Sequence, residues 1–206
     1  VGAVESPKPQ LPVLPTEEAE AERLLAPLDH RRPIVALHAG SRDAARCWPP
    51  ERFAALAHRL YHEWGAQIVL TGSQDDVARS ALIGQVSRAP VLDITGRTDI
   101  GTLAAALDRV DLLVTNDSGP SHIAWARSVP SVVLFGPTDP DRWAPLDRSL
   151  HRPVVSPGRD LHNLSLTEVW PVAEEMLRRS RPVESPISIS PVAKHGPSRT
   201  EDTHEE

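Results

Sequence analysis

The sequence is poor in cysteine, methionine and long apolar runs. The first and last of these shortages argue against disulfide-rich and membrane-spanning proteins. A single cysteine, Cys47, cannot form an internal disulfide framework and fits a reducing compartment. No apolar run approaches the ~20 residues that a membrane-spanning helix needs. The N-terminal residues also lack the apolar core of a secretory signal. The only methionine is Met176 and the chain begins at Val1, so we expect a processed chain or a fragment.

The charge balance and the absence of common motifs narrow the function further. The formal net charge is -6, and an acidic chain gains little from a phosphate backbone, so we expect no nucleic-acid partner. The sequence contains neither G-x-G-x-x-G nor G-x-x-x-x-G-K-[ST], which argues against an ordinary dinucleotide or P-loop site. It also lacks the G-x-S-x-G motif of α/β serine hydrolases.

Histidine is frequent but is not arranged as a metal site. None of the nine histidines lies at a metal-ligand spacing from the cysteine. His58 and His62 are four residues apart in a helical pattern, yet no third ligand is evident. We therefore expect no metal ion and no other cofactor.

Short apolar runs alternate with amphipathic segments between residues 33 and 180. The runs predict strands at 34–37, 68–70, 91–94, 112–114 and 131–135. The segments between them predict helices at 50–64, 75–86, 99–110 and 123–128, a last helix at 167–179, and a helix start near Thr16. This alternation indicates an α/β fold with a Rossmann-like parallel sheet and helices on both faces.

The composition divides the chain into three parts. Residues 1–32 begin with a proline-rich stretch followed by acidic residues, and read as an interdomain linker and helix. Residues 33–180 form the predicted Rossmann-like domain. Residues 181–206 are rich in proline and serine and end in acidic residues, which predicts a disordered tail.

Polar or glycine-bearing loops follow four of the predicted strands. They are HAGS at 38–41, TGS at 71–73, NDSG at 116–119 and GPT at 136–138. Ligands of open parallel sheets bind beyond the carboxyl ends of the strands, so these loops should share one edge. Glycine in each loop also serves simple turn geometry, which leaves a structural interpretation open for any one of them.

The segment NDSGPSH at 116–122 carries the clearest chemistry. Ser118 is a favourable N-cap and Pro120 is tolerated early in a helix, so backbone N–H groups there could bind a pyrophosphate. His122 could donate to a phosphate oxygen. Asp117 would repel phosphate and is better suited to sugar hydroxyls. The alternative is that Asp117 and Ser118 only cap the helix.

Two other loops could contribute to the same site. Arg46 follows the Gly40 turn and could neutralise a diphosphate leaving group. Trp48, close by, is interpreted as a packing residue. Asp75 and Asp76 could bind ribose or sugar hydroxyls, although acids at a helix start are an equally good explanation.

Together these segments resemble glycosyltransferase family 9, the ADP-heptose:lipopolysaccharide heptosyltransferases. The matching stretches are HAGS at 38–41, RCWP at 46–49, FA at 53–54, VLTGS at 69–73, TGRT at 95–98, NDSGPSH at 116–122 and LFGPTDP at 134–140. Their common order and spacing make the resemblance specific. It covers the whole C-terminal domain of such an enzyme.

The resemblance implies the C-terminal half of a GT-B glycosyltransferase, which inverts the anomeric centre without a metal ion. In the family this half holds the ADP-sugar donor. By motif position, the donor-binding residues would be Ser41, Arg46, Asp76, Asp117, Ser118, Gly119 and His122. Asp75 is a less favoured alternative to Asp76, and Arg46 stands where the family usually has lysine.

The family's catalytic base and acceptor site lie in its N-terminal domain. We therefore expect no catalytic residue in this chain, which alone should bind an ADP-heptose-like donor weakly and transfer no sugar. The acceptor would be a lipopolysaccharide core or another cell-envelope glycan, met through the missing domain. This implies a cytoplasmic protein at the inner face of the inner membrane, where it could make peripheral membrane contact.

Two other interpretations compete with a glycosyltransferase fragment. The chain could be a stand-alone nucleotide-sugar-binding module without catalysis, which the upstream coding sequence would distinguish from a fragment. A weaker alternative is another α/β enzyme, such as a nucleotide-sugar epimerase, for which this domain would need catalytic acids of its own.

Overall fold

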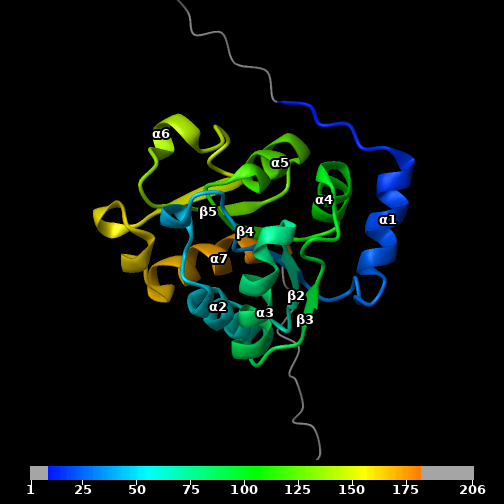
Figure 1. Ribbon diagram of the computed structural model, residues 1–206, viewed down its shortest axis with the longest axis horizontal. Helices are drawn as coiled ribbons and strands as arrows, with labels where there is room; N and C mark the ends of the chain where they lie inside the picture. Colours follow the sequence, from blue (N-terminus) through cyan, green and yellow to red (C-terminus); the bar gives the residue numbers. More distant parts are fainter. Residues whose placement is uncertain (1–8, 182–206) are drawn as a thin grey trace, which may run out of the picture.

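Six short segments pair as the strands of a parallel sheet in the order β3-β2-β1-β4-β5-β6 (Figure 1). The computed structural model describes residues 9–181; residues 1–8 and the remainder of the predicted tail, 182–206, lie outside the described residues. The strands are β1 Ile34–His38, β2 Gln67–Thr71, β3 Val91–Asp93, β4 Leu112–Asn116, β5 Ser131–Phe135 and β6 His151–Val155. All five neighbouring pairs are parallel.

Helices connect the strands and cover both faces of the sheet. They are α1 Pro15–Leu25, α2 Pro50–Trp64, α3 Val77–Val86, α4 Ile100–Leu107, α5 Gly119–Arg127, α6 Pro140–Trp143 and α7 Leu166–Ser180. Single 3-10 turns occupy η1 Ala44–Arg46, η2 Gln74–Asp76, η3 Pro157–Arg159 and η4 Leu161–Asn163. Gly65, predicted to end α2, does so in the left-handed conformation that glycine adopts without strain.

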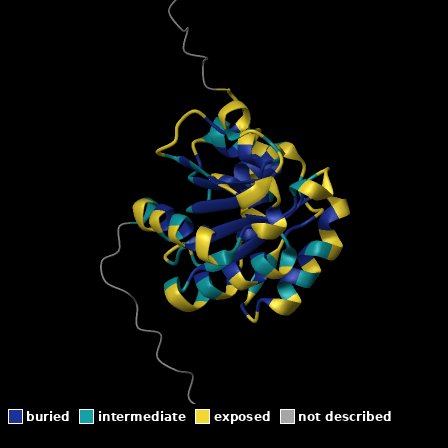
Figure 2. Cartoon of the chain, turned by 90° about the vertical axis from the view of Figure 1, so that its left-hand side faces the viewer, coloured by how far each residue is buried: buried dark blue, intermediate teal, exposed yellow. Residues whose placement is uncertain are grey.

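The alternation of side chains along β1 shows how each face is buried. Val35 and Leu37 enter the large cluster formed with α2 and α7, whereas Ala36 packs with α4 and α5 on the opposite face. Ile34 joins α1 and the second half of α4. Figure 2 shows the strands as a buried layer between helices whose exposed residues face outward. The doubly covered parallel sheet predicted from the sequence is therefore confirmed.

The structure moves the start of one predicted helix and adds a strand. The predicted helix at 123–128 begins at Gly119, because Pro120, whose φ is fixed near the helical value, favours the first turn of a helix. The strand β6 was not predicted, since Pro153 interrupts its apolar run. Proline is tolerated there because β6 pairs only with β5 and lies at the edge of the sheet.

Both ends of the described chain are attached to the sheet. Helix α1 lies beside α4 in Figure 1, and its residues Ala21, Leu24 and Leu25 are buried in the cluster that includes Ile34. At the other end, Arg181 donates to the Asp111 carboxylate and to backbone carbonyls at residues 30 and 31. The predicted tail boundary at 181 therefore falls one residue inside the hydrogen-bonded structure.

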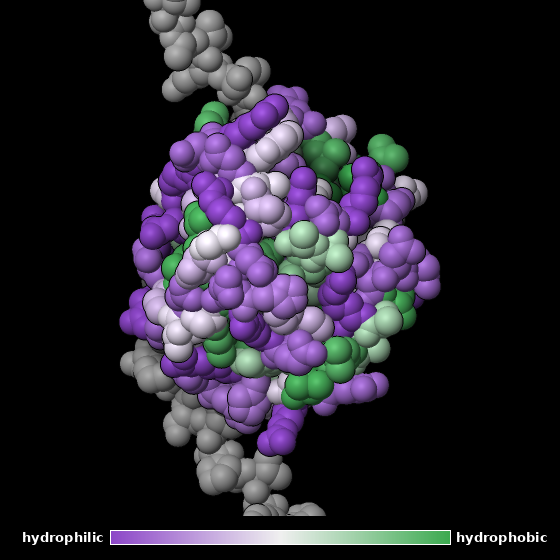
Figure 3. Space-filling view, turned by 60° about the vertical axis from the view of Figure 1, so that its left-hand side comes forward, coloured by the Kyte–Doolittle hydropathy of each residue, from purple (hydrophilic) through white to green (hydrophobic). Residues whose placement is uncertain are grey.

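The surface combines charged groups with isolated apolar residues. On the face shown in Figure 3, hydrophobic residues form small groups between hydrophilic ones. Trp143 and Leu146, which follow the carboxyl end of β5, are among the exposed large apolar side chains. Within residues 9–181, no helix is long and apolar enough to cross a membrane.

Candidate functional site

The carboxyl edge of the sheet contains a topological switch point between β1 and β4. From β1 the chain moves outward to β2 and β3, then returns to build β4, β5 and β6 on the other side. The loops that leave β1 and β4 therefore diverge, and open parallel sheets bind their ligands at such a point. The four loops singled out in the sequence follow β1, β2, β4 and β5, all parallel, so they share this edge as predicted.

The start of α5 is open to a ligand. Ser118 occupies the N-cap position, but its side chain makes no capping hydrogen bond and its hydroxyl donates to the Asn116 carbonyl at 3.3 Å instead. Gly119 is exposed, and a Cβ added there would meet no atom within 4 Å. The chain's own packing thus does not require glycine at this position. Pro120 has no N–H, and the Ser121 N–H donates to the Ser118 carbonyl at 3.0 Å, so α5 offers an anion the Gly119 N–H and the positive end of the helix dipole.

The loop after β1 brings Arg46 to the same place. Its guanidinium Nη1 lies 3.8 Å from Asp117 Oδ2, and the Arg46 side chain is 40% exposed while that of Asp117 is 5% exposed. The separation is beyond hydrogen-bond length, so the guanidinium keeps donors for another acceptor. The structure therefore brings two of the predicted site residues together across the switch point.

Ser41 and His122 lie in the same two segments. Ser41 is partly exposed in the turn after β1, and His122 is exposed in the first turn of α5. Together with Arg46, Asp117, Ser118 and Gly119, they place six of the seven predicted donor-binding residues in the loops at the switch point.

Asp76, the seventh, has a structural function that the sequence left as an alternative. Its Oδ2 accepts from the backbone N–H of Ser73 at 2.9 Å and from the Ser73 hydroxyl at 2.7 Å, while Oδ1 accepts from Arg79 at 3.1 Å. The side chain is buried against Gly40, where an added Cβ would lie 2.4 Å from its carboxylate atoms. Asp76 thus caps the turn before α3 and joins the β1 and β2 loops, whereas Asp75 is exposed.

A histidine that the sequence reasoning did not select lies beneath the site. His38 ends β1, is 7% exposed, and its Nδ1 shares a hydrogen bond of 3.1 Å with the Thr71 hydroxyl. Burial lowers the pKa of His38 from 6.5 to about 4; nearby Asp76 opposes this shift and Arg79 adds to it. The imidazole is therefore neutral near pH 7.

Asn116 and Thr138 are further polar residues at this edge that the sequence did not mark as site residues. The Asn116 side chain is fully buried and forms hydrogen bonds to the backbone of the β1 loop. Among the described residues, Thr138 Oγ1, in the loop after β5, is a buried oxygen without a hydrogen-bond partner. Only the three-dimensional structure identifies them, Asn116 by its bonds to a distant loop and Thr138 by its burial, because neither residue type is unusual in a loop.

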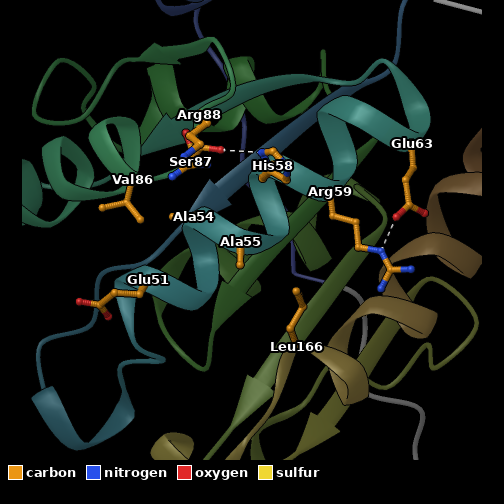
Figure 4. A pocket seen from close by; sticks show the side chains of 10 residues that line it. All are labelled: Glu51, Ala54, Ala55, His58, Arg59, Glu63, Val86, Ser87, Arg88 and Leu166. Carbon is orange, nitrogen blue, oxygen red and sulfur yellow. Dashed lines mark hydrogen bonds and ion pairs between the residues drawn. The ribbon is translucent and has the colours of Figure 1, made fainter.

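A groove elsewhere on the molecule contains none of the predicted site residues. It has a volume of about 480 Å³ and is lined by α2, by residues 86–88 at the end of α3, and by Leu166 (Figure 4). His58 lies in it, with Nδ1 3.0 Å from the Ser87 carbonyl oxygen, and Arg59 pairs with Glu63 at 2.6 Å. Within residues 9–181, no group of three or more histidine, cysteine, aspartate or glutamate side chains is placed to hold a metal ion.

The low pKa of His38 predicts a specific loss of stability in acid. The folded-state pKa is about 4 and the reference value is 6.5, so between these values the unfolded chain binds more protons. The contribution of neutral His38 is present above pH 6.5 and is lost as the pH falls toward 4. We expect about 2 kcal/mol of this loss between pH 7 and pH 5.

Urea unfolding of the wild type and of His38→Asn at several pH values checks this expectation. The stability of His38→Asn should fall less steeply between pH 6.5 and pH 4, with His30→Asn, on the surface loop before β1, as the control. Equal slopes for the wild type and His38→Asn would contradict the buried neutral state of His38.

Comparison with known proteins finds lipopolysaccharide heptosyltransferases among the relatives of this chain. A profile of glycosyltransferase family 9 (heptosyltransferase) matches residues 2–163. Lipopolysaccharide heptosyltransferase 2 of Salmonella typhimurium is 32% identical over 152 residues, which are 70% of this chain and 43% of that protein. Lipooligosaccharide heptosyltransferase 2 of Haemophilus influenzae is 34% identical over 149 residues, which are 68% and 42% of the two proteins. The chain thus spans about two fifths of the length of these curated relatives.

Solved structures agree with the sequence relatives. A glycosyl transferase family 9 protein from Veillonella parvula superposes with a TM-score of 0.76 at 25% identity, over 82% of this chain and 54% of that one. The ADP-heptose lipopolysaccharide heptosyltransferase II of Escherichia coli gives a TM-score of 0.70 at 26% identity, over 83% and 54%. The fold is that of one Rossmann-like half of a GT-B glycosyltransferase. Since the family profile matches most of the residues and the same fold recurs in its solved members, the chain belongs to glycosyltransferase family 9.

Proposed function

We propose that this chain binds the ADP-sugar donor of a heptosyltransferase-type reaction, with the diphosphate at the N-terminus of α5. The observation that carries the proposal is the arrangement at the switch point. Gly119 has free space in front of it, no side chain caps the helix, and Arg46 lies beside Asp117 with donors to spare. An uncapped helix start with an adjacent cation is suited to a diphosphate.

The relatives support the class of donor. The solved Escherichia coli relative at 26% identity is an ADP-heptose lipopolysaccharide heptosyltransferase, and the curated relatives are lipopolysaccharide or lipooligosaccharide heptosyltransferases. An adenine nucleotide carrying a heptose-like sugar is therefore the donor we propose for this chain. The acceptor we propose is a lipopolysaccharide core or another cell-envelope glycan at the inner face of the inner membrane.

Each residue of the site has a part in the proposed reaction. An acceptor hydroxyl attacks the anomeric carbon and gives its proton to a base, the bond from that carbon to the diphosphate oxygen breaks, and ADP leaves with the electron pair. Arg46, His122 and the Gly119 N–H at the start of α5 would stabilise the charge that develops on the diphosphate. The buried Asp117 carboxylate would accept hydrogen bonds from sugar hydroxyls and orient Arg46.

The remaining polar groups have supporting parts in this proposal. Ser41, in the turn after β1, would bind the diphosphate from the side opposite to α5. Asp76 has its carboxylate engaged by Ser73 and Arg79, so its contribution to donor hydroxyls would come from the lone pairs that those bonds leave free. We assign no catalytic base to the described residues and propose that the base lies outside them.

The proposed site predicts selective nucleotide binding that depends on Gly119. In calorimetric titrations of the 206-residue chain, ADP should bind more tightly than UDP or NAD. Gly119→Ala should weaken ADP binding about tenfold, or ~1.4 kcal/mol, because a methyl group enters space that the diphosphate needs. Since an added Cβ meets no atom of the protein, its unfolding free energy should stay within ~0.5 kcal/mol of wild type.

A second variant, His122→Ala, tests whether a side chain in the first turn of α5 contributes to binding of the diphosphate. His122→Ala should weaken ADP binding by about three- to tenfold through the loss of one donor to phosphate. A preference for UDP would retain the site and exclude heptose as the favoured sugar. Unchanged ADP affinity in both Gly119→Ala and His122→Ala would refute the assignment of the diphosphate to α5.

A stand-alone nucleotide-sugar-binding module is the second candidate, because we assign no catalytic base to the described residues. In an assay with ADP-heptose and a lipopolysaccharide core acceptor, we expect the chain alone to transfer no sugar for want of a base. Turnover by the chain alone would show that the base is among its own residues. Restoration of transfer by a separately supplied partner half would exclude the purely binding function.

A further inference from the structure

A buried amide connects the end of β4 to the loop that leaves β1. Asn116 is the last residue of β4 and its side chain is completely buried. Its Oδ1 accepts from the backbone N–H of Trp48 at 3.0 Å, and its Nδ2 donates to the carbonyl of Ala39 at 2.9 Å and, more weakly, to that of Gly40 at 3.5 Å. The single side chain thus holds both ends of the loop that leaves β1.

The partners dictate the chemistry of this position. A backbone N–H can only donate and a backbone carbonyl can only accept, so the side chain must offer one acceptor and one donor at a fixed separation. Aspartate lacks the donor, and leucine of similar shape lacks both groups. Either replacement leaves buried backbone groups unpaired, and such groups are unfavourable in a protein interior.

The loop held by Asn116 carries the proposed donor-binding residues Ser41 and Arg46. Arg46 is two residues before Trp48, and the Trp48 indole Nε1 donates to the Leu164 carbonyl at 2.8 Å, which anchors the far end of the loop. The next residue, Asp117, is bonded to the strand on the other side of β4: its N–H donates to the Leu134 carbonyl of β5 at 3.0 Å. Two adjacent residues therefore connect the ends of β1, β4 and β5.

We propose that Asn116 is the positioning residue of the donor site: it fixes the β1 loop across the switch point, so that Arg46 faces Asp117 and the N-terminus of α5. This inference rests on the proposed function, since it concerns the same diphosphate site. Asn116 is fully buried, so it acts through the loop and not by touching the donor.

A double-mutant cycle with Arg46 separates positioning from general destabilisation. Asn116→Ala should weaken ADP binding about tenfold in the wild-type background, because the released loop must be ordered again at each binding event. In the Arg46→Ala background the same change should weaken ADP binding less than about twofold, since the cation that the loop presents is already absent. Equal factors in both backgrounds would overturn the proposal.

Ser131→Ala is the matched control for lost stability. Ser131 is also completely buried and shares a hydrogen bond of 2.8 Å with His151 Nδ1, but it begins β5 at the opposite edge of the sheet. Its replacement should lower the melting temperature and leave the ADP affinity within about twofold of wild type. A tenfold loss of affinity in Ser131→Ala would show that general destabilisation explains the effect of Asn116→Ala.

The hydrogen bonds from the Asn116 side chain to the β1 loop, here called the Asn116 clamp, can also be tested without a variant, in case Asn116→Ala does not fold. The test is backbone hydrogen exchange. The Trp48 backbone amide of the wild type should exchange as slowly as amides in β1 and β4, although it lies in a loop. Exchange at the rate of exposed loop amides would contradict the clamp. A wild-type chain that binds no ADP would refute the proposed function, and slow Trp48 exchange in that chain would still support the clamp itself.

Discussion

The strands β1 and β4 are buried on both faces, and this constraint decides where polar chemistry can occur in the molecule. Along β1, Val35 and Leu37 pack under α2 and α7 while Ala36 packs under α4 and α5. In such a sheet, polar side chains can reach a ligand only at the ends of the strands. His38 and Asn116 lie at these ends and are themselves buried, and each has a hydrogen-bond partner: His38 bonds to Thr71 at the end of β2, and Asn116 bonds to the β1 loop.

The carboxyl edge combines rigid and open parts. Asp76 fills the space left by Gly40 and Gly72 and caps the turn before α3, while Asn116 fixes the β1 loop to β4. The start of α5 stays open, because Ser118 does not cap it and Gly119 is exposed. A site with a fixed frame and an open helix start is preorganised for an anion, and such preorganisation reduces the entropy lost on binding.

The sequence predicted the fold well and the site in part, for reasons that individual residues show. Apolar runs bounded by glycine located the central strands, and the rule for parallel sheets placed the loops after β1 and β4 together. The pattern could not reveal Asn116, whose partner Trp48 is 68 positions away. The strand β6 was not predicted because it contains Pro153. That proline is tolerated because β6 lies at the edge of the sheet. Asp76 could have been recognised as a cap from Ser73 three residues earlier, a spacing typical of a capping box.

The central claim is that the diphosphate of an adenine nucleotide binds between the β1 loop and the start of α5. Its most direct test is an NMR titration of the isotope-labelled chain with ADP, following every assigned backbone amide. The account predicts the largest shifts at residues 40–48 and 117–122, and little change at residues 86–88 in the groove between α2 and α3. Shifts concentrated in that groove, with the amides of Gly119 and His122 unmoved, would contradict it.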